Sequence, residues 1–251
     1  MESTDGSRKA GAATGSPVHP EDPGAAAAAG GPGDRQFGPY AVAILANEHW
    51  SLLAARSLIW SEALSRATVF LTVLSASIIA LALLADATGF GPHTTTLALV
   101  LLPVVLLLGI ATYARQVQIN TEEFRLVLAM NRLRHAYLQI EPGLEPYFTS
   151  GHHDDERGLL ASYMLDHPSR RWFVVHFLIN TPTVVATVVA ALATTIVVLL
   201  LQVAGAALAA QVACGAVASL TVWGGLMAAQ RHALEPLRDV TPKFPTPPGT
   251  P

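Results

Sequence analysis

The fold is decided by residues 177–230, FLINTPTVVATVVAALATTIVVLLLQVAGAALAAQVACGAVASLTVWGGLMAAQ, none of which carries a charge. As one straight helix this run would be about 80 Å long, whereas the hydrocarbon of a bilayer is about 30 Å thick. The run is therefore expected to cross a membrane twice. Val203-Ala204-Gly205-Ala206 is the predicted turn between the two crossings.

Two further apolar segments precede this run, and all four are predicted as transmembrane helices. A helix needs about 20 apolar residues to span a bilayer, and the four segments have that length: residues 67–85, 94–113, 182–201 and 207–229. The predicted fold class is an all-α polytopic membrane protein. It has two transmembrane hairpins, 67–113 and 182–229, with a helical cytoplasmic segment, 114–180, between them.

Composition agrees with this fold and excludes several functions. The chain is 51% hydrophobic and 13% charged, against about 25% charged residues in soluble domains. This deficit of charge makes the lipid bilayer the expected partner. A net charge of −3 does not favour binding to nucleic acid. Cys214 is the single cysteine, which leaves no intramolecular disulfide.

Basic residues predict the orientation in the membrane. Of fifteen Lys and Arg, five precede the first span, seven lie between the second and third, and three follow the fourth. The positive-inside rule then places both termini and the central segment in the cytoplasm. The residues interpreted as membrane-interface anchors are Arg66, Arg115, Arg170, Arg171, Trp172 and Arg231.

Both ends of the chain have a low-complexity composition. Residues 1–37 are rich in Gly, Ala and Pro, lack the apolar core of a secretory signal and are expected to be disordered. Residues 233–251 are a Pro-rich tail. An extended tail is the expected structure; docking on a groove that binds polyproline is the alternative.

Two cytoplasmic helices are expected beside the spans. Residues 40–64 form a loose apolar face before the first span, interpreted as an interfacial helix or as a stalk that transmits or assembles. Asn120-Thr121-Glu122-Glu123 has the pattern of a capping box and predicts a helix start. The predicted packing face of that second helix is Leu126, Met130, Leu133, Tyr137 and Ile140. Its partner is either the 40–64 helix or a second subunit.

One cluster has the composition of a metal site. His152, His153, Asp154 and Asp155 are adjacent, and imidazoles and carboxylates bind zinc or manganese. Neighbouring residues point in different directions, however, so this spacing makes a poor site. Asp154 or Asp155 has a simpler role as the N-cap of a helix through Leu165.

The spans contain no ionisable residue and the chain contains no catalytic motif. Ionisable residues inside spans mark proton relays and substrate sites, so a transporter is the less favoured function. No phosphate-binding loop, nucleophile elbow or dinucleotide fingerprint occurs. The chain is therefore predicted not to be an enzyme, and no cofactor is expected.

Three short motifs stand out along the chain: Trp60-Ser61-Glu62 with Arg66, residues 131–137 (NRLRHAY) and residues 151–155 (GHHDD). In these motifs the stretch from Trp50 to about Ala191 resembles a family of uncharacterised integral membrane proteins of high-GC bacteria. The resemblance implies a multi-pass protein of the bacterial inner membrane and supplies no activity. In layout, residues 40–140 are also similar to SLATT domains, which are thought to be membrane effectors in bacterial conflict systems.

Two functional hypotheses follow. The first is a non-enzymatic scaffold or signalling protein whose central segment meets a cytoplasmic protein partner or a second copy of the chain. The second is an oligomeric pore-forming or membrane-effector protein, motivated by spans rich in small residues and by the SLATT-like layout.

Overall fold

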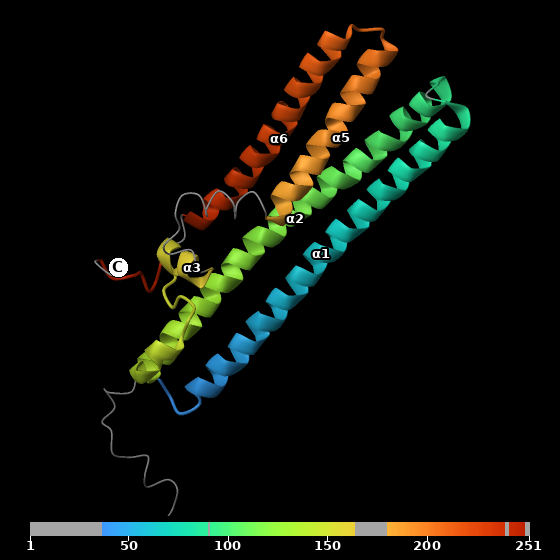
Figure 1. Cartoon of the computed structure of the whole chain (residues 1–251). Coiled ribbons are helices and arrows are strands. Elements are labelled where there is room, and N and C mark those ends of the chain that lie inside the picture. Colours follow the sequence, from blue (N-terminus) through green and yellow to red (C-terminus); the bar gives the residue numbers. More distant parts are fainter. Residues whose placement is uncertain (1–36, 90, 164–179, 239–240, 249–251) are drawn as a thin grey trace, which may run out of the picture. The chain divides into compact units, whose positions relative to one another are not determined.

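The structure, a computed structural model, describes residues 37–89, 91–163, 180–238 and 241–248 (Figure 1). Within these ranges every regular element is helical, which confirms the predicted all-α class. The elements are α1 (Ala41–Thr88), α2 (Pro92–Ile140), the 3-10 helix η2 (Pro142–Tyr147), α3 (Glu156–Ser162), α5 (Thr181–Val203) and α6 (Leu208–Arg238).

Four of these helices are long and apolar enough to cross a membrane, as the sequence predicted: α1, α2, α5 and residues Leu208–Pro236 of α6. With 23 residues, α5 is about 35 Å long, close to the thickness of a bilayer. By contrast, α1 has 48 residues and α2 has 49, so each is about 70 Å long. Both therefore extend well past any bilayer that their apolar parts could span.

The 40–64 helix runs into the first apolar segment, as expected, whereas α2 is continuous where the sequence predicted a helix start. The 40–64 helix and the first apolar segment are parts of one helix, α1. The predicted helix start at Asn120 is wrong, because residues 120–123 lie inside α2. A capping box needs a non-helical residue before it, and here the chain is already helical from Pro92. Glu123 instead accepts a hydrogen bond from Arg56 Nη2 of α1 at 2.9 Å.

Local signals fix the ends of α5. The Asn180 side chain accepts a hydrogen bond from the Thr183 amide at 2.9 Å and caps the helix, and Pro182 occupies its first turn, where its missing N–H costs nothing. After α5 the chain turns at Gly205, whose φ of 72° lies in the region that glycine adopts without strain. The predicted turn at residues 203–206 is confirmed.

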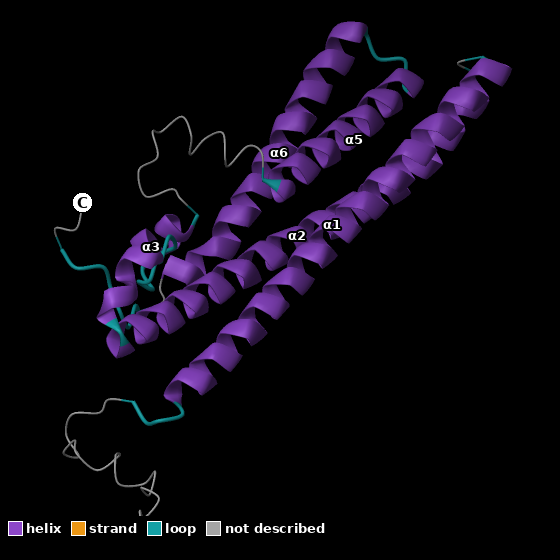
Figure 2. Cartoon of the chain, turned by 60° about the horizontal axis from the view of Figure 1, so that its bottom comes forward, coloured by secondary structure: helices purple, strands orange, loops and turns teal. Residues whose placement is uncertain are grey.

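Within the unit Val42–Pro251, α2 is the central helix. It contacts α5 and α6, and α1 lies alongside it in the opposite direction in both views (Figures 1 and 2). At Gly109 of α2 an added Cβ would lie 2.9 Å from atoms of both Phe70 of α1 and Val189 of α5. Glycine here lets three helices converge, and Phe70 and Val189 are fully buried.

Candidate functional site: a polar platform at one end of the long helices

Charged side chains gather on the N-terminal half of α1 and the C-terminal half of α2. We call this region the polar platform and define it as residues 41–64, 115–163 and 241–248. Figure 2 shows that α3 and the C-terminal segment lie beside this end of α2. The platform also holds most of the site residues that the sequence singled out.

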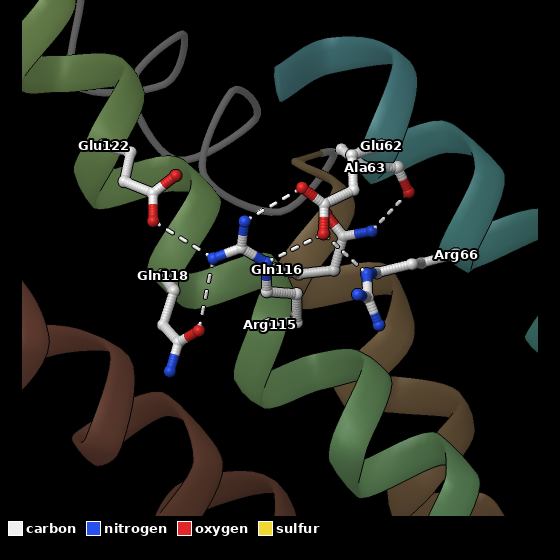
Figure 3. A network of polar contacts seen from close by, with 7 residues as sticks. All are labelled: Glu62, Ala63, Arg66, Arg115, Gln116, Gln118 and Glu122. Carbon is white, nitrogen blue, oxygen red and sulfur yellow. Dashed lines mark hydrogen bonds and ion pairs between the residues drawn. The ribbon is translucent and has the colours of Figure 1, made fainter. Parts of the chain in front are cut away.

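An ion-pair network joins α1 to α2 where the platform begins (Figure 3). Arg115 donates from Nε and Nη2 to the two oxygens of Glu62, each at 2.9 Å, and Arg66 donates to the same carboxylate at 2.8 Å. The hydrogen bond from Arg115, and next that from Arg66, lowers the pKa of Glu62 to about 2. Beside this network, Gln116 donates to the Ala63 carbonyl at 2.6 Å.

Two of the predicted interface anchors, Arg66 and Arg115, are therefore partners of one carboxylate. Arg115 also donates to Glu122 at 3.0 Å. The position of these arginines beside apolar segments predicts a helix end. Local sequence does not predict Glu62 as their shared acceptor, because Glu62 and Arg115 lie on different helices.

Two further contacts connect α1 and α2 along the platform. Arg56 donates to Glu123 at 2.9 Å, and Glu123 is 7% exposed. Glu123 also lies near Tyr163, the residue that follows α3. Burial, and next this carboxylate, raise the pKa of the Tyr163 hydroxyl. Farther out, the rings of His49 and Tyr137 stack with centroids 6.0 Å apart. On α2 these contacts fall between Arg115 and Tyr137, so the two helices are connected at several points along the platform.

Asn131 holds the loop 151–158 on α2. This side chain is fully buried, and its Nδ2 donates to the carbonyls of His153 at 2.9 Å and Gly158 at 3.0 Å. Its Oδ1 accepts from Ser162 at 2.9 Å and from Arg134 at 2.7 Å. Both donors and the acceptor of this amide are therefore satisfied, as burial requires.

Asp154 binds the C-terminal segment. Its side chain is 0% exposed and accepts hydrogen bonds from the amides of Lys243 at 2.9 Å and Phe244 at 2.7 Å, and from Arg132 at 2.7 Å. Burial alone would raise the pKa of this carboxyl, but the two amides and then the guanidinium outweigh it and leave the pKa below its ordinary value. The main chain adds a contact from the Asp154 amide to the Phe244 carbonyl at 3.3 Å.

Asp155 has two roles. Its side chain accepts from the Gly158 amide at 2.8 Å and caps α3, which confirms the predicted N-cap. It also accepts from the amide of Thr246 at 2.8 Å and from the Thr246 hydroxyl at 2.9 Å. The helix was expected to continue through Leu165, which lies outside the described residues, but α3 ends at Ser162, with Tyr163 as its C-cap.

Two imidazoles contact Phe244, and a third lies beside them. The ring of His135 stacks on Phe244 with centroids 4.2 Å apart, and Nδ1 of His153 lies 3.3 Å from the Phe244 carbonyl. The His152 and His153 rings are 4.3 Å apart. Burial, and next the proximity of His153, lower the pKa of both His135 and His152. Residues 243–246 of the Pro-rich tail are thus bound to α2 and to the loop 151–158.

This geometry adds no support for a metal centre. Among the residues that the structure describes, no group of three or more His, Cys, Asp or Glu could hold a metal ion. The carboxylates of Asp154 and Asp155 already accept hydrogen bonds from the C-terminal segment. The hypothesis that His152, His153, Asp154 and Asp155 bind zinc or manganese therefore rests on the sequence alone.

The remaining predicted residues are distributed over several environments. Met130 is fully buried in α2, and Leu126, Leu133, Tyr137 and Ile140 are half-buried. Of the two partners considered for that face, α1 is in contact with it through the His49–Tyr137 stack. Arg231 is exposed on α6. Arg170, Arg171 and Trp172 lie outside the described residues.

Comparison with known proteins gives no relative: no family model, no curated protein and no solved structure matches this chain.

Proposed function

We propose that the chain is a multi-pass protein of the bacterial inner membrane that acts as a non-enzymatic scaffold or signalling protein. In this proposal the apolar helices form two transmembrane hairpins, and the termini and the polar platform are cytoplasmic. The platform is the surface that partners bind. The distribution of basic residues supports the orientation, since seven of the fifteen fall between the second and third spans.

The packing of the helices supports a placement in which α1, α2, α5 and α6 cross the bilayer at the same depth. Gly109, Phe70 and Val189 bring α2, α1 and α5 together, and the Tyr113 hydroxyl donates to the Leu226 carbonyl of α6. The first charged network, at Glu62 and Arg115, lies immediately beyond these contacts along α1 and α2. A bilayer centred on the apolar contacts leaves the platform outside the hydrocarbon.

The observation that carries the scaffold proposal is the exposure of Trp50. This side chain is 72% exposed and lies sixteen residues before Arg66 on one continuous helix, which is about 24 Å. The headgroup layer extends only about 5–8 Å beyond the hydrocarbon. In the proposed placement lipid does not reach Trp50, so its exposure favours the stalk interpretation of residues 40–64 over the interfacial helix.

Trp50 belongs to an apolar stripe on α1. Trp50, Leu53, Trp60 and Leu64 follow one another at spacings of three, seven and four residues, which places them on one helix face, and all four are exposed. Exposed apolar patches rimmed by polar residues mark interaction surfaces. A stripe of this kind fits the apolar face of a partner helix, either in another protein or in a second copy of the chain.

Orientation and partnership can be tested together. A promiscuous biotin ligase inserted after Leu144, which is 40% exposed in η2, labels neighbours only where cytoplasmic ATP is present. The same ligase inserted at Gly91 is the control for the opposite side. We expect labelling from the Leu144 insertion only; labelling from the Gly91 insertion alone would reverse the orientation.

A pair of matched variants tests the Trp50 stripe. Trp50→Ser removes an exposed aromatic from the stripe, and Tyr147→Ser removes one that is 78% exposed elsewhere on the platform. We expect Trp50→Ser to lose specific labelled proteins, or cross-links between two copies, that Tyr147→Ser retains. Identical labelling in both variants, and in an unrelated membrane-anchored ligase, would disprove the scaffold proposal.

A further inference from the structure

The C-terminal segment is bound through its backbone as well as its side chains. The amides of Lys243, Phe244 and Thr246 donate to Asp154 and Asp155. The Phe244 carbonyl accepts from the Asp154 amide. The Lys243 and Phe244 amides donate to the two oxygens of Asp154, and the Thr246 amide donates to Asp155. These contacts require an extended peptide in one register, because each amide has its own acceptor oxygen.

Proline stands at the one position of this segment where no donor is required. Residues 243, 244 and 246 each donate an amide N–H, and residue 245 between them is proline, which has none. Proline also restricts the residue before it to extended conformations, which lowers the entropy lost when the segment binds. The site therefore fits the sequence of the segment as well as its backbone.

Two side chains complete the recognition. Phe244 stacks on His135, and the Thr246 hydroxyl donates to Asp155. The lysine side chain is not required by any of these contacts, because residue 243 contributes its amide. The features that the site recognises are thus an aromatic residue, a proline and a hydroxyl-bearing residue in succession.

The site also needs its ligand. Asp154 is fully buried, and two of its three hydrogen-bond donors come from the C-terminal segment. A buried carboxylate that loses its donors is strongly disfavoured. When the segment leaves, either water or another extended peptide must take its place.

We propose that His135, His153, Asp154 and Asp155 form a binding site for an extended Phe-Pro-Thr peptide, and that the same chain's Lys243–Thr246 is its bound ligand. This inference goes beyond the scaffold role and does not depend on the orientation in the membrane. A partner that carries the same motif would bind only by displacing the C-terminal segment.

Lysine-specific proteolysis of the full chain tests this site. The chain has two lysines, Lys9 and Lys243, so an endoproteinase that cleaves only after lysine reports on the docked segment. We expect cleavage after Lys243 to be at least about tenfold slower than in a free peptide of residues 239–251. Cleavage of the native chain at the free-peptide rate would overturn the proposal.

Site variants leave the cleaved sequence unchanged. His135→Ala removes the ring under Phe244, and Asp154→Asn weakens acceptance of the two amides; each is expected to raise the rate of cleavage after Lys243 about tenfold. Cleavage after Lys9 monitors protease activity, and helix content by circular dichroism monitors folding. A folded His135→Ala chain whose Lys243 is cleaved no faster than in the native chain would contradict the role of the stack.

Competition identifies the ligand class. A synthetic peptide of residues 239–251 with Lys243→Arg resists this protease, and in excess it should displace the segment and accelerate cleavage after Lys243. The Lys243→Arg peptide that also carries Phe244→Ala should not accelerate cleavage. The Lys243→Arg peptide that instead carries Thr241→Val should act like the Lys243→Arg peptide. If the Lys243→Arg peptide does not accelerate cleavage at millimolar concentration, the site is not open to peptides in trans and the proposal fails.

Dilution distinguishes the source of the ligand. Protection of Lys243 that is independent of protein concentration assigns the segment to its own chain, since an intramolecular contact is unaffected by dilution. Protection that disappears on dilution would overturn that assignment in favour of exchange between two copies.

Discussion

Phe244 stacks on His135, with ring centroids 4.2 Å apart and the rings inclined by 22°. This contact connects the C-terminal segment to α2, so the platform is assembled from parts that are distant in sequence. The same segment satisfies the buried Asp154. Order in the loop 151–158 and docking of the C-terminal segment are consequently coupled.

Acidification is predicted to release the C-terminal segment. The pKa values of His135 and His152 are lowered in the folded chain, so the unfolded chain binds more protons as the pH falls below about 6.5. The contribution of the neutral rings to stability is complete above that pH and declines below it. We expect cleavage after Lys243 to accelerate between pH 7 and pH 5.5.

The charged groups near His135 and His152 could also titrate, so the experiment needs a control that separates them from the two rings. His153 and Asp154 act on His135, and His153, Glu145 and His135 act on His152. The pKa of Asp154 is lowered in the folded chain, so this carboxylate keeps its charge between pH 7 and pH 5.5. His135→Gln should flatten the response between pH 7 and pH 5.5, and an unchanged response would assign it to another group.

Glu62→Gln is predicted to weaken the pairing of α1 with α2. The neutral amide has no negative charge and offers one acceptor oxygen instead of two, so the ion pairs with Arg115 and Arg66 are lost. The thermal unfolding temperature in detergent should therefore fall. Glu48→Gln, at an exposed position on the same helix, is the matched control. Equal unfolding temperatures for the two variants would show that the network contributes nothing measurable.

The pKa of Glu62, about 2, gives this network a defined pH range. A carboxylate with a lowered pKa contributes stability that is present above its unfolded pKa and is lost as the pH falls through the folded value. The difference between native chain and Glu62→Gln should therefore persist from pH 7 to pH 5. Loss of that difference by pH 5 would contradict the assigned contacts.

Gly109→Ala is predicted to destabilise the helix packing by about 1–3 kcal/mol, the usual cost of overpacking a core. The new methyl would lie 2.9 Å from atoms of Phe70 and Val189. Gly224→Ala is the control, because nothing lies within 4 Å of its added Cβ. Alanine favours a helix over glycine, so the control should be neutral or stabilising in denaturation by heat or by a denaturing detergent.

Asn131→Ala is predicted to release the loop 151–158 and α3 from α2. The substitution removes the donor to the carbonyls of His153 and Gly158, and each unsatisfied buried group costs about 1–3 kcal/mol. Hydrogen exchange of the α3 amides should accelerate, and exchange in α5 should not. Asn47→Ala, an exposed position on α1, should leave both unchanged.

Parts of this fold follow directly from local sequence. An uncharged run too long for one crossing requires a turn, and Gly205 provides it. The span predicted from residue 182 is reproduced as α5, with Pro182 in its first turn. These features depend on a few neighbouring residues. The N-cap role of Asp155 is of the same kind.

Other parts depend on contacts between distant segments and could not be inferred from spacing. Asn120 and Glu123 have the pattern of a helix start, yet α2 is already helical there, because the preceding apolar segment continues into it without a break. The pair Asp154-Asp155 attracted a metal hypothesis through its composition. Its observed partners are Lys243, Phe244 and Thr246, which no local pattern connects to it.

The unbroken course of α1 has a mechanical consequence. Since no hinge separates its apolar part from the platform, a tilt of the helix in the membrane moves both together. In the proposed orientation, a tilt of about 10° displaces Trp50 by about 4 Å relative to the bilayer surface, because the arm between Arg66 and Trp50 is about 24 Å. Helices tilt to match bilayer thickness, so a thinner or thicker membrane shifts the partner-binding stripe sideways.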